Sequence, residues 1–287
     1  MTGIKIDGKE IAQTVKDRVK RAVEELKKQG INPCLATILV GDNQASATYV
    51  KNKHKACEEV GIITKDYKLS SGITQFELNK IIVELNNDKS IHGILVQLPL
   101  PNQLDEFVTT SRISPLKDVD GLTPHNVGLL AMKKAVLVAC TPLGVMEMFD
   151  YHNIELEGKN IVLINRSNLI GKPLYHLLLA RNATVITCHS KTKNIKELCQ
   201  LADIVITAVG DRSKFTLTPD MIKKDAIVID VAISKYKEKL VGDTDYDQII
   251  QKASYATPVP GGVGPMTVAM LLKNTITAAS LSSQIER

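Results

Sequence analysis

The segment TYVKNKHK, residues 48–55, gathers a tyrosine, a histidine and several lysines in a helix-like stretch. Tyr49 and Lys53 lie four residues apart, so in a helix they share one face, whereas Lys51 and Lys55 are expected to point into water. A lysine held in a site can move protons, and a neighbouring tyrosine offers a flat apolar surface with a polar tip. The segment alone leaves two interpretations of Lys53, a solvated charge or a proton-transfer group.

Two further polar residues occur where the chain turns sharply. Gln97 lies near the end of the apolar run GILVQL, 93–98, which is followed by proline. Asp120 lies in KDVDG, a sequence typical of a turn. Each has an ordinary structural interpretation. Together with Tyr49 and Lys53 they could also converge on one catalytic cleft.

Regular elements must position these residues, and the chain alternates short apolar runs with amphipathic segments. Apolar spacing predicts a helix over 10–29, Thr74 and Glu77 match a capping box, and Thr141-Pro142 matches a helix start. Runs rich in valine and isoleucine predict strands that are buried on both faces of parallel sheets. These runs are residues 34–40, 93–98, 160–165, 183–188, 203–210 and 226–232.

The alternation of strands and helices predicts an α/β protein with two lobes, each built on a mainly parallel sheet. A chain of 287 residues is long enough for two cores. The irregular stretch near 115–140 marks the predicted seam. We predict a first domain of 1–138 together with a C-terminal helix, 266–287, and a second domain of 139–265.

Composition restricts the class of partner. The chain is 44% hydrophobic with a net charge of +5, and its basic residues are mixed with acids. This pattern argues against nucleic-acid binding and leaves small anionic ligands as partners. No apolar run approaches the ~18 residues of a membrane span, and the polar start lacks a signal-peptide core. We therefore expect a soluble, cytoplasmic protein that does not bind membranes.

The cysteines support the same compartment. Cys34, Cys57, Cys140, Cys188 and Cys199 are widely spaced, and no CxxC pair occurs. An odd number at such spacings argues against a disulfide framework or a zinc site and favours a reducing compartment. We expect no bound metal.

The second lobe carries a candidate nucleotide site in NIVLINRSNLIGKPL, 160–174. An apolar strand runs into a polar turn that contains Asn165, Arg166 and Ser167, and a helix follows. Backbone N–H groups at such a helix start attract phosphate. The glycine-rich dinucleotide fingerprint is absent, so an ordinary strand-to-helix turn remains an alternative.

The ends of the following strands favour NADP over NAD. Residues 183–188 lead into His189-Ser190-Lys191, where an NAD-binding protein would place a carboxylate against the ribose. Hydroxyls and a cation here, with Arg166 in the preceding turn, would attract a 2′-phosphate. Ligands bind at the carboxyl ends of strands in open α/β sheets. Further candidates to line the cofactor are therefore Ala208, Gly210 and Ile233.

Motifs along nearly the whole chain resemble the bifunctional FolD family, methylenetetrahydrofolate dehydrogenase/methenyltetrahydrofolate cyclohydrolase. In order they are ASATYVKNKHKACEEVGI, GILVQLPLP, SPLKDVDGL, CTPLGV, NRSNLIGKP, ATVITCHSKT, ADIVITAVG and PVPGGVGPMTVAMLL. The resemblance implies a folate-binding catalytic domain, a Rossmann-like NAD(P)-binding domain and a homodimer. It implies NADP-dependent oxidation of 5,10-methylenetetrahydrofolate to the methenyl cation. Hydrolysis to 10-formyltetrahydrofolate would follow.

The resemblance also assigns roles to residues. Lys53 matches the catalytic lysine, Tyr49 the tyrosine packed on the folate, Gln97 the hydrogen-bond partner of the lysine and Asp120 the acid that grips the pterin. Gln97 can orient Lys53 without adding a charge that would hold it protonated. The substrate-binding residues implied are Tyr49, Lys53, Val96, Gln97, Leu98, Asp120, Pro260, Gly261 and Gly262. The cofactor-binding residues implied are Asn165, Arg166, Ser167, Ser190, Ala208, Gly210 and Ile233.

Departures from the family pattern fall mainly on the cofactor side. Asn165 stands where the family usually has glycine, Ala232 replaces the glycine of D-V-G-I, and Ala139 replaces the proline of P-C-T-P. We expect Asn165 to preserve its turn because asparagine tolerates left-handed backbone. Two alternative functions remain. One is a monofunctional dehydrogenase. The other is a non-catalytic sensor of nucleotide or folate, which Asn165 and Ala232 would favour.

Overall fold

The computed structural model describes residues 2–285, and within them the chain forms two compact units. One unit contains the residues up to Gln13 and Thr141–Thr267. The other contains Thr14–Cys140 and the chain from Val268 onward. Helices α1 (Gly8–Lys28) and α10 (Val263–Ile285) each contribute to both units. The domain boundaries drawn from the sequence stay a prediction.

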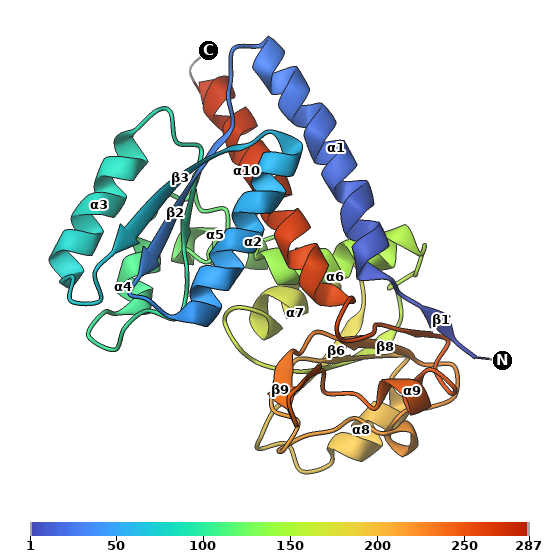
Figure 1. The fold of residues 1–287 in the computed structure, drawn as a ribbon. Coiled ribbons are helices and arrows are strands. Elements are labelled where there is room, and N and C mark those ends of the chain that lie inside the picture. Colours follow the sequence, from blue (N-terminus) through green and yellow to red (C-terminus); the bar gives the residue numbers. More distant parts are fainter. Residues whose placement is uncertain (1, 286–287) are drawn as a thin grey trace. The chain divides into compact units, whose positions relative to one another are not determined.

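The unit of Thr14–Cys140 is built on a three-stranded parallel sheet with the order β3-β2-β4. Helix α3 packs against one face through Leu78, Ile82 and Leu85, and α2 covers the other face (Figure 1). The strands are β2 (Cys34–Val40), β3 (Ile63–Leu69) and β4 (Gly93–Val96). The helices are α2 (Gln44–Val60), α3 (Gln75–Asn87), α4 (Glu106–Ser111) and α5 (Pro124–Ala131).

The other unit is built on a six-stranded sheet with the order β1-β11-β8-β7-β5-β6. Every neighbouring pair is parallel. The chain moves from β5 outward to β6 and then returns to place β7 on the other side of β5. This reversal makes a topological switch point between the carboxyl ends of β5 and β7, where open α/β sheets bind ligands. The strands are β1 (Ile4–Lys5), β5 (Asn160–Ile164), β6 (Thr184–Cys188), β7 (Ile204–Thr207), β8 (Ile227–Asp230) and β11 (Tyr255–Ala256).

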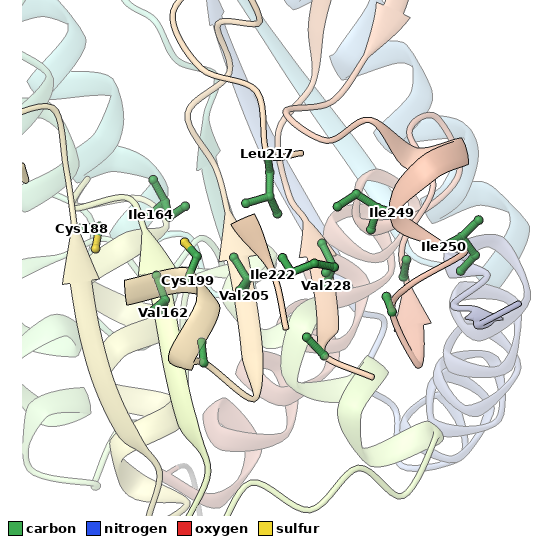
Figure 2. Packing of buried hydrophobic residues seen from close by; sticks show 14 residues of the cluster. Val162, Ile164, Cys188, Cys199, Val205, Leu217, Ile222, Val228, Ile249 and Ile250 are labelled. Carbon is green, nitrogen blue, oxygen red and sulfur yellow. The ribbon is translucent and has the colours of Figure 1, made fainter. Parts of the chain in front are cut away.

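Apolar side chains hold this sheet against its helices. Figure 2 shows Val162, Val205 and Val228 on neighbouring strands, with Ile249 from α9 and Leu217 above them. The helices are α6 (Cys140–Tyr151), α7 (Gly171–Ala180), α8 (Ile195–Leu201), α9 (Tyr246–Ile249) and the 3₁₀ turn η1 (Pro219–Met221). An antiparallel hairpin, β9 (Ser234–Tyr236) and β10 (Lys239–Val241), follows β8.

The predicted fold class is confirmed, and so are the strands predicted from apolar runs. The expectation that all of them are buried on both faces is wrong for β6, which is only partly buried because it lies at the sheet edge. The predicted capping box is also confirmed, because the Thr74 hydroxyl accepts from the Glu77 N–H while the Glu77 carboxylate accepts from the Thr74 N–H. Strand β3 has no counterpart among the predicted strands. Its sequence ITKDYKL carries charges and is only partly buried. It lies at the sheet edge, where solvent accepts those charges.

The described residues contain no helix that is both long and apolar enough to cross a membrane. Within the same range, no group of three or more histidine, cysteine or acidic side chains is placed to hold a metal ion. All five cysteines are free and buried.

Candidate functional site

The Thr14–Cys140 unit brings Lys53 and Gln97 together. Lys53 is half-buried on α2, whereas Lys51 and Lys55 on the same helix are exposed. The Lys53 Nζ donates to the Gln97 Oε1 at 3.1 Å. The Gln97 amide is itself oriented, because its Nε2 donates to the Leu98 carbonyl at 2.7 Å. The predicted contact between the lysine and the strand-end glutamine is therefore present.

The KDVDG loop is held in place by nearly every residue that it contains. Lys117 caps the carboxyl end of α3 by donating to the carbonyls of Leu85 and Asp88. Asp118 is 1% exposed and accepts hydrogen bonds at the start of α5. The Val119 carbonyl accepts a hydrogen bond from the buried Asn274 side-chain amide of α10. These contacts anchor the loop through residues other than Asp120.

Gly121 fixes the turn that presents Asp120. Its φ is +64°, and a Cβ there would lie 2.4 Å from the Val138 carbonyl carbon. Only glycine combines that backbone conformation with so close an approach. The neighbouring Cys140 thiol lies 3.7 Å from the Asp120 Oδ1. The loop is therefore built to hold one carboxylate in a fixed direction.

The charge on Asp120 depends on its surroundings. Burial raises the pKa of the Asp120 carboxyl above its ordinary value, and the positive charge of Lys53 opposes that rise. The two side chains lie close enough for their charges to interact.

Tyr49, four residues before Lys53, is 50% exposed on the same helix. Tyr49, Lys53, Gln97 and Asp120 thus all belong to one unit. Val96, which ends β4, is buried, and Leu98 is half-buried.

In the other unit, Asn165 organises the turn after β5. Its Oδ1 accepts from the N–H groups of Ser167 and Gly171 at 2.8 and 3.0 Å. Its Nδ2 donates to the Ala208 carbonyl at 2.7 Å. The expectation that Asn165 relies on left-handed backbone is wrong, because its φ is not positive. The side chain instead forms the hydrogen bonds that shape the turn. Gly171 permits the packing, since a Cβ there would lie 2.4 Å from the Asn165 carbonyl oxygen.

The remaining predicted cofactor residues occupy the same edge of the six-stranded sheet. Ala208 is buried directly after β7, and Gly210 follows with a φ of +73°. Ser190 is exposed after β6, and Ile233 is 46% exposed after β8. Arg166 and Ser167 are exposed in the β5 turn. The structure therefore gathers these residues at the carboxyl ends of four strands.

A hollow of about 240 Å³ opens beside the β5 turn. Arg166 and Lys172 supply cationic side chains to it, and His176 supplies an imidazole. Gly171, Tyr175 and Thr187 complete its lining. Positive charge next to a helix start suits a phosphate group.

Two buried acids near these strand ends were missed by sequence reasoning. Asp230 ends β8 and is 1% exposed, and Asp243 follows β10 and is 0% exposed. Both accept hydrogen bonds from backbone N–H groups. Their occurrence beside strand ends, in IVID and GDTD, was the only available signal, and such aspartates usually indicate turns.

Pro260, Gly261 and Gly262 lie between β11 and α10, in the unit that holds the six-stranded sheet. Gly261 has a φ of +103°. Gly262 packs tightly within that unit, because a Cβ on Gly8 would lie 1.7 Å from its carbonyl oxygen. The part of these residues in substrate binding stays a prediction.

The six-stranded parallel sheet, its switch point and the cationic turn define a Rossmann-like, nucleotide-binding α/β protein. Residues 139–283 match the family model "Tetrahydrofolate dehydrogenase/cyclohydrolase, NAD(P)-binding domain". Residues 6–120 match the model "Tetrahydrofolate dehydrogenase/cyclohydrolase, catalytic domain". The chain therefore belongs to the tetrahydrofolate dehydrogenase/cyclohydrolase family.

Individual relatives agree over the full length. The chain is 83% identical over 285 residues to the bifunctional protein FolD of Nitrosopumilus maritimus, covering 99% of each. The crystal structure of bifunctional FolD from Campylobacter jejuni has 48% identity and a TM-score of 0.93, covering 96% of this chain and 98% of that one. FolD from Trypanosoma brucei, solved with NADP and an inhibitor, has 36% identity and a TM-score of 0.93, covering 99% of each. The predicted family, with its paired dehydrogenase and cyclohydrolase activities, is confirmed.

Proposed function

We propose that this chain oxidises 5,10-methylenetetrahydrofolate with NADP⁺ and hydrolyses the resulting methenyl cation to 10-formyltetrahydrofolate, with Lys53 as the proton-transfer group. The observation that carries the proposal is the 3.1 Å hydrogen bond from Lys53 Nζ to Gln97 Oε1. A neutral amide directs the lysine without pairing its charge. During turnover, the deprotonated form of the Lys53 amine can accept a proton from the water that attacks the cation.

Asp120 and Tyr49 would hold the folate. A carboxylate can accept paired hydrogen bonds from the amino-pyrimidine edge of a pterin. The anchored KDVDG loop fixes the direction of Asp120, which lowers the entropic cost of binding. Tyr49 offers an exposed ring on the helix that carries Lys53. We propose that Val96 and Leu98, together with Pro260, Gly261 and Gly262, supply further contacts to the substrate.

The residues at the switch point suit NADP. Arg166 and the cationic hollow offer positive charge for a 2′-phosphate, and Ser190 is an exposed hydroxyl after β6. When bound, NADP⁺ supplies the hydride acceptor of the oxidation. Asn165 orients the N–H groups of the β5 turn, while Ala208, Gly210 and Ile233 provide surface for the dinucleotide. A carboxylate that would repel a 2′-phosphate is absent from residues 189–192.

We further propose a homodimer located in the cytoplasm. β6 is an edge strand of the six-stranded sheet, and Leu179 is 46% exposed on α7, which packs against β6. Leu169, in the turn after β5, is 48% exposed. Apolar exposure beside a free edge favours self-association. The five free cysteines favour a reducing compartment. Sedimentation of the purified chain over a range of concentrations tests the dimer, and a purely monomeric profile would exclude it.

The function is tested by supplying 5,10-methylenetetrahydrofolate with NADP⁺ and following NADPH together with the methenyl absorbance. The wild type is expected to form NADPH without lasting methenyl product. Lys53→Ala is expected to lose hydrolysis while its circular dichroism stays unchanged. Lys51→Ala, two residues away and exposed, is the matched control and should behave as wild type. Unchanged hydrolysis in Lys53→Ala would remove Lys53 from its role.

Two other outcomes would support the alternative functions. NADPH formation with persistent methenyl product in the wild type would indicate a dehydrogenase alone. Folate binding without turnover, with either coenzyme, would indicate a sensor.

A further inference from the structure

A fully buried carboxylate lies beneath the turn that follows β7. Asp243 Oδ2 accepts from the Thr207 hydroxyl and from the Val209 N–H, both at 2.6 Å, and its Oδ1 accepts from the Gly210 N–H at 3.0 Å. Asp243 is 0% exposed, so no solvent competes for these bonds. All three partners donate, so both oxygens of the Asp243 side chain act as acceptors.

The segment that carries Asp243 is itself rigid. Thr244 donates to Asp230 Oδ2 through its N–H and its hydroxyl, each at 2.8 Å. Arg212 donates to the carbonyls of Gly242 and Thr244. The Leu217 N–H donates to the Asp243 carbonyl at 2.8 Å. These bonds fix the main chain on both sides of Asp243, so its carboxylate has little freedom to follow a moving turn.

Gly242 shows how closely this segment packs on the end of β8. A Cβ at Gly242 would lie 2.1 Å from the Asp230 Oδ2. The Asp230 carboxylate in turn accepts from the Ala232 N–H at 3.1 Å. Asp230 and Asp243 therefore connect the turns after β8 and β7 through a single rigid segment.

The outer side of the β7 turn remains open. Val209 is 39% exposed, and Gly210 is exposed with a φ of +73°. The N–H groups of both residues are occupied by Asp243, and Asn165 donates to the Ala208 carbonyl. With these groups engaged, the turn offers a ligand mainly an apolar surface of fixed shape.

We propose that Asp243 is a positioning residue for the dinucleotide, which holds the Val209–Gly210 turn in the shape that accepts the coenzyme. The proposal rests on the proposed use of the β7 turn by NADP. Asp243 does not touch the ligand and acts through the turn. The cyclohydrolase step requires no hydride acceptor, so loss of Asp243 should affect the two activities unequally.

The test uses the full-length enzyme with Asp243→Asn, which keeps the shape of the side chain but directs an NH₂ group towards donors. We expect the KM for NADP⁺ to rise about tenfold and the dehydrogenase kcat to fall, because an acceptor of the hydrogen bonds from the turn is lost. Hydrolysis of supplied methenyltetrahydrofolate, measured without coenzyme, should stay within about twofold of wild type. Asp247→Asn, the same substitution at an exposed site four residues on, is the matched control.

Two results would overturn the proposal. An unchanged NADP⁺ dissociation constant, measured by calorimetry, would show that the turn does not depend on Asp243. An equal loss of both activities, with a changed circular dichroism spectrum, would reduce Asp243 to a folding residue. If Asp243→Asn does not fold, Thr207→Val removes only one donor and provides the same comparison. Failure of the proposed function itself would be evident separately, as absence of NADP-dependent turnover in the wild type.

Discussion

The side-chain amide of Asn165, just after β5, donates to the carbonyl of Ala208, just after β7, at 2.7 Å. The bond crosses the switch point of the six-stranded sheet, which is where open α/β sheets bind their ligands. The same side chain accepts from Ser167 and Gly171. One residue thus joins the proposed phosphate turn to the β7 turn.

Asn165→Gly should therefore weaken coenzyme binding without affecting hydrolysis. The substitution removes three hydrogen bonds and adds backbone freedom to the turn, so we expect the KM for NADP⁺ to rise about tenfold. Steady-state kinetics of the dehydrogenase measures this change. Asn168→Gly, in the same loop, controls for the added glycine. A KM that Asn165→Gly leaves unaltered would contradict the role of the amide.

Arg166→Ala should discriminate between the two coenzymes. If the guanidinium pairs with the 2′-phosphate, its loss raises the KM for NADP⁺ about tenfold or more and leaves that for NAD⁺ nearly unchanged. Arg181→Ala, which removes an exposed arginine paired with Asp150 in the same unit, is the control. Equal losses for NADP⁺ and NAD⁺ would refute the phosphate assignment.

Asp118→Ala should reduce stability. Asp118 accepts from the Thr123 N–H and the Asn126 amide at 2.8 and 2.9 Å while it is 1% exposed. Leaving these buried donors without an acceptor should lower the free energy of unfolding by about 3 kcal/mol, measured by urea denaturation. Asp42→Ala, at an exposed site, should change it little. A stable Asp118→Ala protein would show that solvent replaces the lost acceptor.

Asp120→Asn should weaken folate binding and leave stability nearly unchanged, although only one residue separates Asp120 from Asp118. The contacts that anchor the loop are made by Lys117, Asp118 and Val119, and an asparagine can still accept from the Cys140 thiol, so the melting temperature should stay close to that of wild type. The KM for the folate should rise about tenfold, because one charge-assisted acceptor for the pterin is lost. An unaltered folate KM would exclude Asp120 as the pterin-binding acid.

The buried carboxyl group of Asp230 should make the stability of the protein depend on pH. Burial raises its pKa from 3.8 to about 6, so the folded chain binds the proton more tightly than the unfolded chain does. The stabilising effect of protonation is fully present below pH 3.8 and is lost as the pH rises to about 6. Asp230→Asn lacks this titration. Compared with that variant, the free energy of unfolding of wild type should fall by on the order of 3 kcal/mol across this pH range. Denaturation curves at several pH values measure the difference, and a constant difference would contradict the raised pKa.

Much of the fold could be predicted because several strands and helix ends have recognisable patterns in a short stretch of sequence. The strands β2, β4, β5, β7 and β8 are short apolar runs, and their burial on both faces leaves a nearly continuous signal. The Thr74 capping box is likewise a contact within one turn of chain. Strand β3 was missed because its charged residues are acceptable only at a sheet edge, and the position of a strand in its sheet is not a local property.

The sequence by itself determined which side chains could do chemistry. Lys53 and Tyr49 share a helix face through their spacing, and the motifs around Gln97 and Asp120 were sufficient to indicate the family. The sequence did not determine which acid of the KDVDG loop, Asp118 or Asp120, would accept the hydrogen bonds from the start of α5, since both are aspartates in one short turn. Nor did it indicate that Asn165 would reach Ala208, or that Asp243 would lie beneath Gly210. Those contacts join residues more than thirty positions apart, and only the packed chain can bring them within hydrogen-bond distance.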